Sequence, residues 1–177
     1  MNIIVQDETE FGRVRKSAGI TSDLCGITID TSQIAQKTLL FNFDGITPCL
    51  SPSRTRAGNV KVQLTSGTSW SNANAVLTYT FINFKVVRLK ENKIVTLNGT
   101  KTVKNVNGSD WLSFLSGTAT IKYQERSLNL QATFNGGSVA NWNVARVTEC
   151  SYRPSDQRIT FKVNGNSTLE GFANVDL

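Results

Sequence analysis

The chain contains no histidine among its 177 residues, and this absence limits the chemistry that its other side chains could perform. Serine, cysteine and threonine nucleophiles usually depend on an imidazole base. The three cysteines, Cys25, Cys49 and Cys150, do not form the close pairs that a zinc site needs. No glycine-rich phosphate loop and no calcium-binding loop occurs either. We therefore expect no metal, no other cofactor and no enzyme of these classes.

Carboxylates are the remaining groups that could catalyse a reaction. Glu125 and Glu149 fall in segments with strand character, and Asp44 and Asp110 fall at turns. A glycosidase needs two carboxyl groups roughly 5–10 Å apart, and the sequence does not show that any two lie so close. We predict that the chain is not an enzyme, and a carboxylate-pair glycoside hydrolase stays open as an alternative.

Aromatic and basic side chains offer candidates for binding. Trp70 lies in the polar stretch 65–74, where it either packs back onto a sheet or is displayed for stacking on a sugar ring. Trp111 and Trp142 are expected in or beside the core. Arg54 and Arg56 could clamp a carboxylate or a phosphate. Alternatively these arginines, together with Arg146, pair across strands or place charge along a sheet edge.

Two cysteines bracket a segment rich in strand-forming residues. A disulfide between Cys25 and Cys49 would close a 25-residue segment, counted with both ends, and would stabilise the fold by about 3.5 kcal/mol in the chain-entropy model. Three buried thiols are the alternative. If the first two cysteines are bonded, Cys150 either bonds to a cysteine beyond Leu177 or remains a thiol.

The elements that position these residues are strands, because the dominant hydrophobic period is two. Alternation is clearest in residues 60–64, 77–86, 94–103, 128–134 and 159–163. Turn signals fall at Asp44-Gly45, Asn98-Gly99, Asn107-Gly108, Gly136-Gly137 and Asn164-Gly165. The pattern predicts one all-β domain over residues 1–177 with about ten to twelve antiparallel strands. One helical turn is expected within 31–36, before a strand at 37–43.

Two architectures fit so many hairpins. We predict an antiparallel β-sandwich, with a meander curled into a partial barrel as the alternative. A parallel sheet is excluded because the crossover helices that it needs are missing.

The net charge of +6 and the pI near 9.4 come from cations spread along the chain. A nucleic-acid-binding arm would be denser, so we do not expect a nucleic-acid partner, although a basic nucleic-acid binder stays open as an alternative. No apolar run reaches the roughly 18 residues of a membrane span, and residues 1–10 do not read as a signal peptide. We expect a natural chain that is longer at both ends.

Several segments resemble uncharacterised secreted or lipoprotein-type β-rich proteins of Bacteroidetes bacteria. The similarity rests on residues 25–29, 40–45, Cys49 and 53–62, and continues through 81–86, 97–103 and 142–146. It implies an export or lipidation signal before this chain, a cell-envelope or extracellular location, and further chain after Leu177 that would supply a partner for Cys150. Asp44-Gly45-Ile46, Pro48 and Pro52 depart from the pattern, so the geometry of that loop is open.

Together these features predict a non-catalytic, secreted or cell-envelope binding module, or a structural one. A glycan or a protein is the expected partner, and a lipid anchor, if present, lies outside this sequence. The candidate binding residues are Trp70, Arg54 and Arg56.

Overall fold

The computed structural model describes residues 25–49, 54–109, 111–164 and 167–172. In these ranges, ten strands form one antiparallel sheet in the order β1-β2-β3-β4-β5-β6-β8-β9-β10, and β7 pairs with β6 beside that path. The strands are β1 (Ile27–Asp30), β2 (Thr38–Asp44), β3 (Arg54–Ser66), β4 (Val76–Arg88), β5 (Lys93–Asn105), β6 (Ile121–Phe134), β7 (Val139–Asn141), β8 (Ala145–Arg153), β9 (Arg158–Val163) and β10 (Ser167–Phe172). The predicted antiparallel all-β class and strand number are confirmed.

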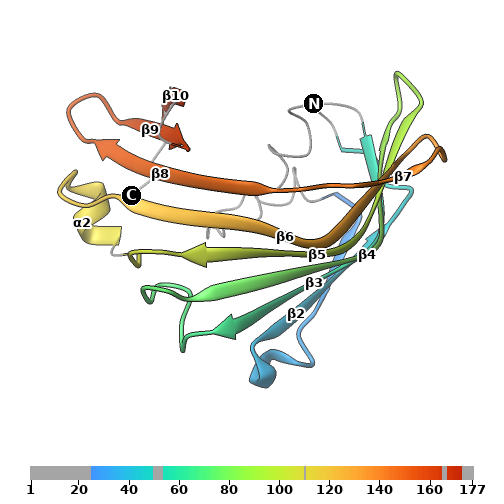
Figure 1. The fold of residues 1–177 in the computed structure, drawn as a ribbon, viewed down its shortest axis with the longest axis horizontal. Helices are drawn as coiled ribbons and strands as arrows, with labels where there is room; N and C mark the ends of the chain where they lie inside the picture. Colours follow the sequence, from blue (N-terminus) through green and yellow to red (C-terminus); the bar gives the residue numbers. More distant parts are fainter. Residues whose placement is uncertain (1–24, 50–53, 110, 165–166, 173–177) are drawn as a thin grey trace.

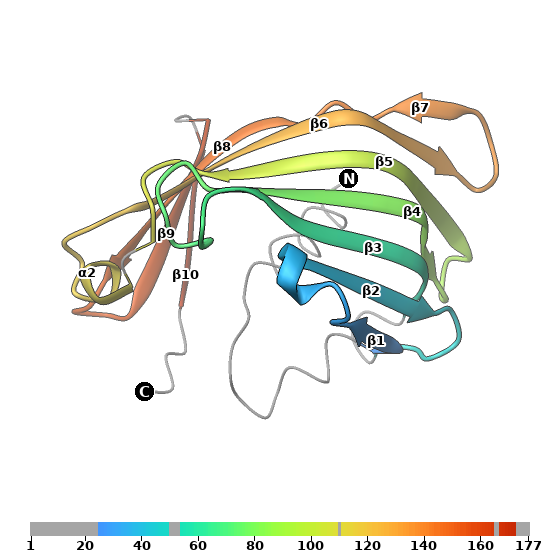
Figure 2. The same ribbon diagram turned by 90° about the horizontal axis from the view of Figure 1, so that it is seen from below.

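Of the two architectures left open, the chain adopts the curled meander, with one continuous sheet in place of the two stacked sheets of a sandwich. Figure 2 shows the sheet as an arch whose first and last strands curl toward the same side. Each strand from β1 to β6 pairs with its successor in the sequence, so the topology is local (Figure 1). Short hairpins make this meander easy to form because no long connection has to cross the sheet.

Among the described residues, two short helices accompany the sheet. The 3₁₀ turn η2 (Ile34–Gln36) lies inside the predicted 31–36 segment and ends at Lys37, which has a φ of 56°. The helix α2 (Trp111–Leu115) joins β5 to β6 and was not predicted, since five residues give no readable helical period.

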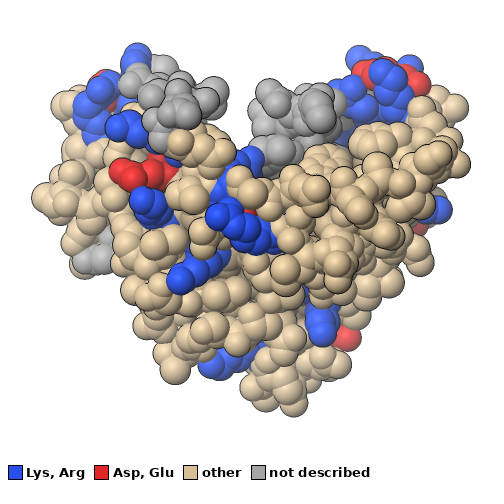
Figure 3. Space-filling view, in the orientation of Figure 1, with Lys and Arg blue, Asp and Glu red and all other residues tan. Residues whose placement is uncertain are grey.

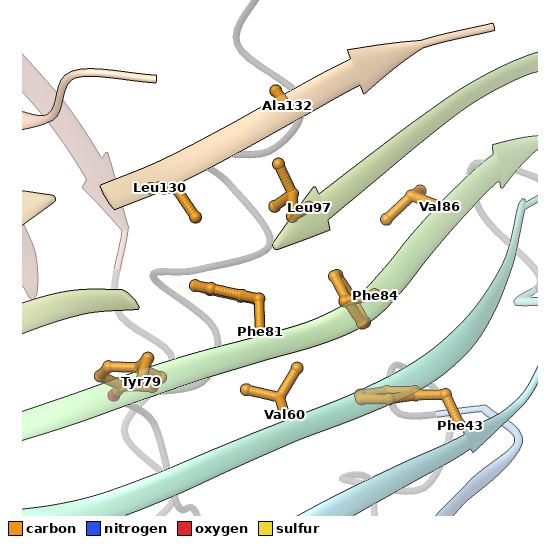
Figure 4. Close-up of a cluster of buried hydrophobic side chains, with 9 residues drawn as sticks. All are labelled: Phe43, Val60, Tyr79, Phe81, Phe84, Val86, Leu97, Leu130 and Ala132. Atoms are coloured by element: carbon orange, nitrogen blue, oxygen red, sulfur yellow. The ribbon is translucent and has the colours of Figure 1, made fainter. Parts of the chain in front are cut away.

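The buried face of the sheet is the face on which side chains of β2 to β6 pack together (Figure 4). Its members are Phe43, Val60, Tyr79, Phe81, Phe84, Val86, Leu97, Leu130 and Ala132. Trp142 packs against this cluster, as predicted, and so does Val144. The side chain of Trp111 lies outside the described residues. A second cluster of Phe114, Ile121 and Cys150 joins α2 to β6 and β8.

Irregularities in strand pairing occur on neighbouring central strands, and they change which residues of a strand face the core. Register shifts occur between Ala57 and Asn59, between Phe81 and Phe84, and between Asn98 and Thr100. The predicted turn at Asn98-Gly99 is therefore wrong: β5 continues through it, and Gly99 has a φ of 117° within the strand. A Cβ at Gly99 would lie 2.1 Å from the carbonyl oxygen of Asn129, so only glycine fits this close approach of two backbones.

Candidate functional site

The predicted disulfide between Cys25 and Cys49 is confirmed, with 5.3 Å between the two Cα atoms. It ties the residues preceding β1 to the connection between β2 and β3, where Cys49 forms an isolated bridge with Arg54. Arg56 Nη1 donates to Cys49 Sγ at 2.9 Å and lies 3.7 Å from Cys25 Sγ. Cys150 is not part of this disulfide and packs in the second cluster. The bond therefore fixes the start of the sheet covalently.

Arg54 and Arg56, predicted as binding residues, lie on the buried face near this disulfide. Their register partners on β4 are Arg88 and the core residue Val86. Arg56 is only 3% exposed. Since β3 runs between β2 and β4, these arginines do not cover a sheet edge. Their positions are those of internal residues of the sheet.

Trp70 packs back onto the sheet at the other end of β3. Its ring stacks on Tyr123 with 5.8 Å between centroids and an interplanar angle of 8°. Its carbonyl accepts a hydrogen bond from Asn105 Nδ2 at 2.9 Å. Since β3 has 13 residues, roughly 40 Å separates the loop of Trp70 from Arg54 and Arg56. The three predicted binding residues therefore do not form one site.

The candidate carboxylates Glu125 and Glu149 point to opposite faces of the sheet. Glu125 is opposite Arg146 in the register, whereas Glu149 is opposite Lys122, three residues away on each strand. Asp44 accepts hydrogen bonds from the backbone N–H groups of Ile46 and Thr47 within its own turn. Asp110 lies outside the described residues. The fold therefore does not bring together the Glu125–Glu149 pair that a glycosidase would need.

Glu125 belongs instead to a buried charged triad with Lys101 and Arg146. Lys101 Nζ lies 3.4 Å from Glu125 Oε1, and Arg146 donates to Oε2 of the same carboxylate. Lys101 is 2% exposed and Glu125 is 8% exposed. Lys101 Nζ also lies 5.5 Å from the centroid of the Tyr79 ring. Such burial is costly for charges unless they are paired, which accounts for the shared carboxylate.

Sequence reasoning missed a different aromatic surface, on the hairpin that joins β6 to β7. Phe134 is 52% exposed and Val139 is 61% exposed. The Phe134 and Trp142 rings stack with 6.3 Å between centroids at 27°. The hairpin projects from one end of the sheet (Figures 1 and 2). The sequence feature that could have identified this surface is its composition, because no charged residue occurs from Phe134 to Ala145.

The backbone holds this hairpin surface in place. Trp142 N donates to the carbonyl of Leu130 at 2.7 Å, and β7 pairs with residues 131–133 of β6. Asn141 and Asn143 are exposed, but strand alternation puts them on the face of the hairpin opposite Trp142, where Asn141 lies opposite Gln131 in the register. We call Phe134 and Trp142 the hairpin surface. It is a fixed aromatic pair at the edge of the buried face, whereas the exposed Val139 lies on the other face, opposite Thr133.

Within the described ranges, no cluster of three or more His, Cys, Asp or Glu residues could hold a metal ion. In the same part of the chain, no helix has the length and apolar character needed to cross a bilayer. Protein-family models, curated proteins and solved structures were compared with the chain, and none of them matches it.

Proposed function

We propose that this chain is a non-catalytic domain of an extracellular or cell-envelope protein and that it binds a neutral glycan through the hairpin surface. The observation that carries the proposal is the partly exposed, stacked Phe134–Trp142 pair on a hairpin without charge. A protein is the second candidate partner, because exposed apolar side chains such as Val139 also serve protein interfaces.

The chemistry of the hairpin surface matches that of a sugar ring. The apolar face of a pyranose packs on an aromatic ring, and the stacked Phe134 and Trp142 rings offer such a platform. The absence of charge from Phe134 to Ala145 favours a neutral sugar over a phosphorylated or sulfated one.

The disulfide supports the proposed location. Disulfides persist in secreted and cell-surface proteins and are rare in the reducing cytosol. The bond between Cys25 and Cys49 joins residues 24 positions apart, so its loss would remove a substantial constraint on the unfolded chain. The resemblance to secreted and lipoprotein-type proteins agrees with this location.

The test is titration of the protein with neutral oligosaccharides of several linkages, followed by intrinsic tryptophan fluorescence and calorimetry. Phe134→Ala should weaken binding about 2- to 12-fold, because an aromatic stacking contact contributes about 0.5–1.5 kcal/mol. The matched control is Leu112→Ala on α2, which removes a side chain that is 83% exposed at a distant surface.

Thermal unfolding of each variant separates a binding defect from a folding defect. Binding that survives Phe134→Ala but is lost with Trp70→Ala would move the site to the loop between β3 and β4. A panel with no binder among neutral sugars would contradict the glycan proposal and leave a protein partner as the alternative.

A further inference from the structure

The outer face of the sheet, opposite the buried face, carries a compact group of cations on β5 and β6. In the register, Lys104 lies opposite Gln124. Lys122 and Arg126 lie two residues on either side of Gln124, on the same face of β6. Both are therefore diagonal neighbours of Lys104, at roughly 7–8 Å between Cα atoms. We call these three residues the outer basic cluster.

Few carboxylates compensate this cluster. Among the described residues, Glu149 is the sole acidic one on the outer face of β5, β6 and β8, and it lies 3.9 Å from Lys122 Nζ. It is also the register partner of Lys162 on β9. Arg126 donates to the backbone carbonyl of Glu125 at 2.9 Å, and no described carboxylate lies within ion-pair distance of Lys104. The face therefore keeps an excess of positive charge.

The side chains around the cluster indicate what kind of polyanion fits. Thr100 and Thr102 of β5 lie on this face beside Lys104, and Thr78 of β4 lies opposite Thr102. Their hydroxyl groups match the hydroxyl groups of a polysaccharide. The outer faces of β5, β6 and β8 carry no aromatic residue among the described positions, whereas single-stranded nucleic acids are usually held by stacking on aromatic rings.

From this arrangement we infer that the outer basic cluster binds a polyanionic polysaccharide, with carboxylate or sulfate groups of the chain lying against Lys104, Lys122 and Arg126. Figure 3 shows one face of the molecule, on which Lys and Arg side chains outnumber Asp and Glu among uncharged residues. The cluster does not overlap the hairpin surface, which is uncharged. This inference therefore goes beyond the proposed function and does not depend on it.

The experiment measures binding of the full chain to heparin and to polygalacturonate over a series of salt concentrations. The variant K104Q/K122Q/R126Q should lower affinity at low salt by about 10- to 100-fold, since it removes three exposed charge contacts that are each worth up to about fivefold in affinity. The matched control K37Q/K90Q/K93Q removes the same charge from the turn before β2 and from the hairpin between β4 and β5, and it should change affinity less than about threefold. Glu149→Gln should tighten binding by removing the one nearby carboxylate.

Equal losses in the triple variant and in its matched control would overturn the inference, because they would show a dependence on net charge alone. No binding at low salt would also overturn it, as would tighter binding to anionic vesicles or to single-stranded DNA. If the triple variant does not fold, Lys104→Gln and Arg126→Gln tested singly should each weaken binding by about two- to fivefold. Phe134→Ala should leave polyanion binding unchanged, so the two proposals fail independently.

Discussion

Strands β5, β6 and β8 carry charged side chains on both faces, and the two groups follow different rules. On the buried face, Lys101 and Arg146 share the carboxylate of Glu125, and Lys101 also lies against the Tyr79 ring. On the outer face, one carboxylate serves several cations, of which the nearest is 3.9 Å away. Water screens the outer charges, whereas the buried charges must be paired within the protein.

The difference teaches how residues that look alike in the sequence take different roles. Glu125 and Glu149 both lie on strands next to basic residues, yet only Glu125 lies in a place where its charge has to be matched. The side of the sheet, and not the residue type, decides between a structural ion pair and a surface group. Substitutions that change one face at a time can therefore test this rule.

The largest expected effect is that of Glu125→Gln compared with Glu149→Gln. Removing the shared carboxylate leaves two cations buried, so we expect a loss of about 3–5 kcal/mol in the free energy of unfolding. The Glu149 side chain is 41% exposed, and its substitution should change that free energy by less than about 0.5 kcal/mol. Urea denaturation of both variants measures the difference.

Similar losses in the two variants would show that the triad is not a buried element. Lys101→Met combined with Glu125→Leu and Arg146→Met sharpens the test, because replacing all three charges by apolar groups should recover much of the stability lost in Glu125→Gln.

The second prediction concerns the bulges that assign residues to the two faces. Gly99→Ala places a Cβ 2.1 Å from the Asn129 carbonyl oxygen at a φ of 117°. Gly136 also has a positive φ, of 71°, but a Cβ added there would have no other atom within 4 Å. We expect Gly136→Ala to cost about 1–2 kcal/mol from backbone strain alone, and Gly99→Ala to cost about 1–3 kcal/mol more from the clash.

Thermal and urea unfolding of the two alanine variants provide the measurement. If Gly99→Ala were no more destabilising than Gly136→Ala, the close approach of β5 to β6 would not be a constraint on the fold. Amide hydrogen exchange in β5 and β6 would show whether the clash loosens the pairing at that point.

These bulges also mark how far the sequence could be read. Alternation predicted the strands, the disulfide loop was recognised from its two cysteines, and residues 31–36 gave the helical turn. A strict period of two over 77–86 places Phe81 and Phe84 on opposite faces, but the register shift between them returns both to the core. Asn83, with a φ of 48°, gives no distinctive signal in a polar sequence.

The candidate site was less predictable than the fold, because binding depends on exposure. Trp70 lies in a polar loop, yet the parallel stacking on Tyr123 brings it back onto the sheet. Phe134 looks like a core residue of an alternating strand, yet it is half exposed where β6 extends into the hairpin. In both cases, contacts between segments distant in the sequence determine how exposed the side chain is. The residue pattern within one segment does not reveal such contacts.

The smallest expected effect is a pH dependence that separates the buried face from the exposed ends of the sheet. Burial raises the pKa of Tyr123 above its ordinary value of 10.0, and a hydrogen bond involving Ser109 opposes the shift. At the exposed turn after β8, the hydrogen bond from Arg153 lowers the pKa of the Asp156 carboxyl group. Burial therefore favours the neutral phenol, whereas the surface arginine favours the charged carboxylate.

As the pH rises, the folded chain keeps the Tyr123 proton to a higher pH than the unfolded chain does, and this sets the sign of the effect on stability. The contribution of this residue to stability is complete below pH 10.0 and is lost as the pH rises through the folded-state pKa. Tyr123→Phe should reduce the fall in the free energy of unfolding above pH 10.0. In a titration of the native protein followed by tyrosinate absorbance, the tyrosine that ionises at the highest pH should be missing from the variant. If the titration of the variant instead lacked a tyrosine of ordinary pKa, water would reach the Tyr123 hydroxyl group and the stacked Trp70 ring would not shield it.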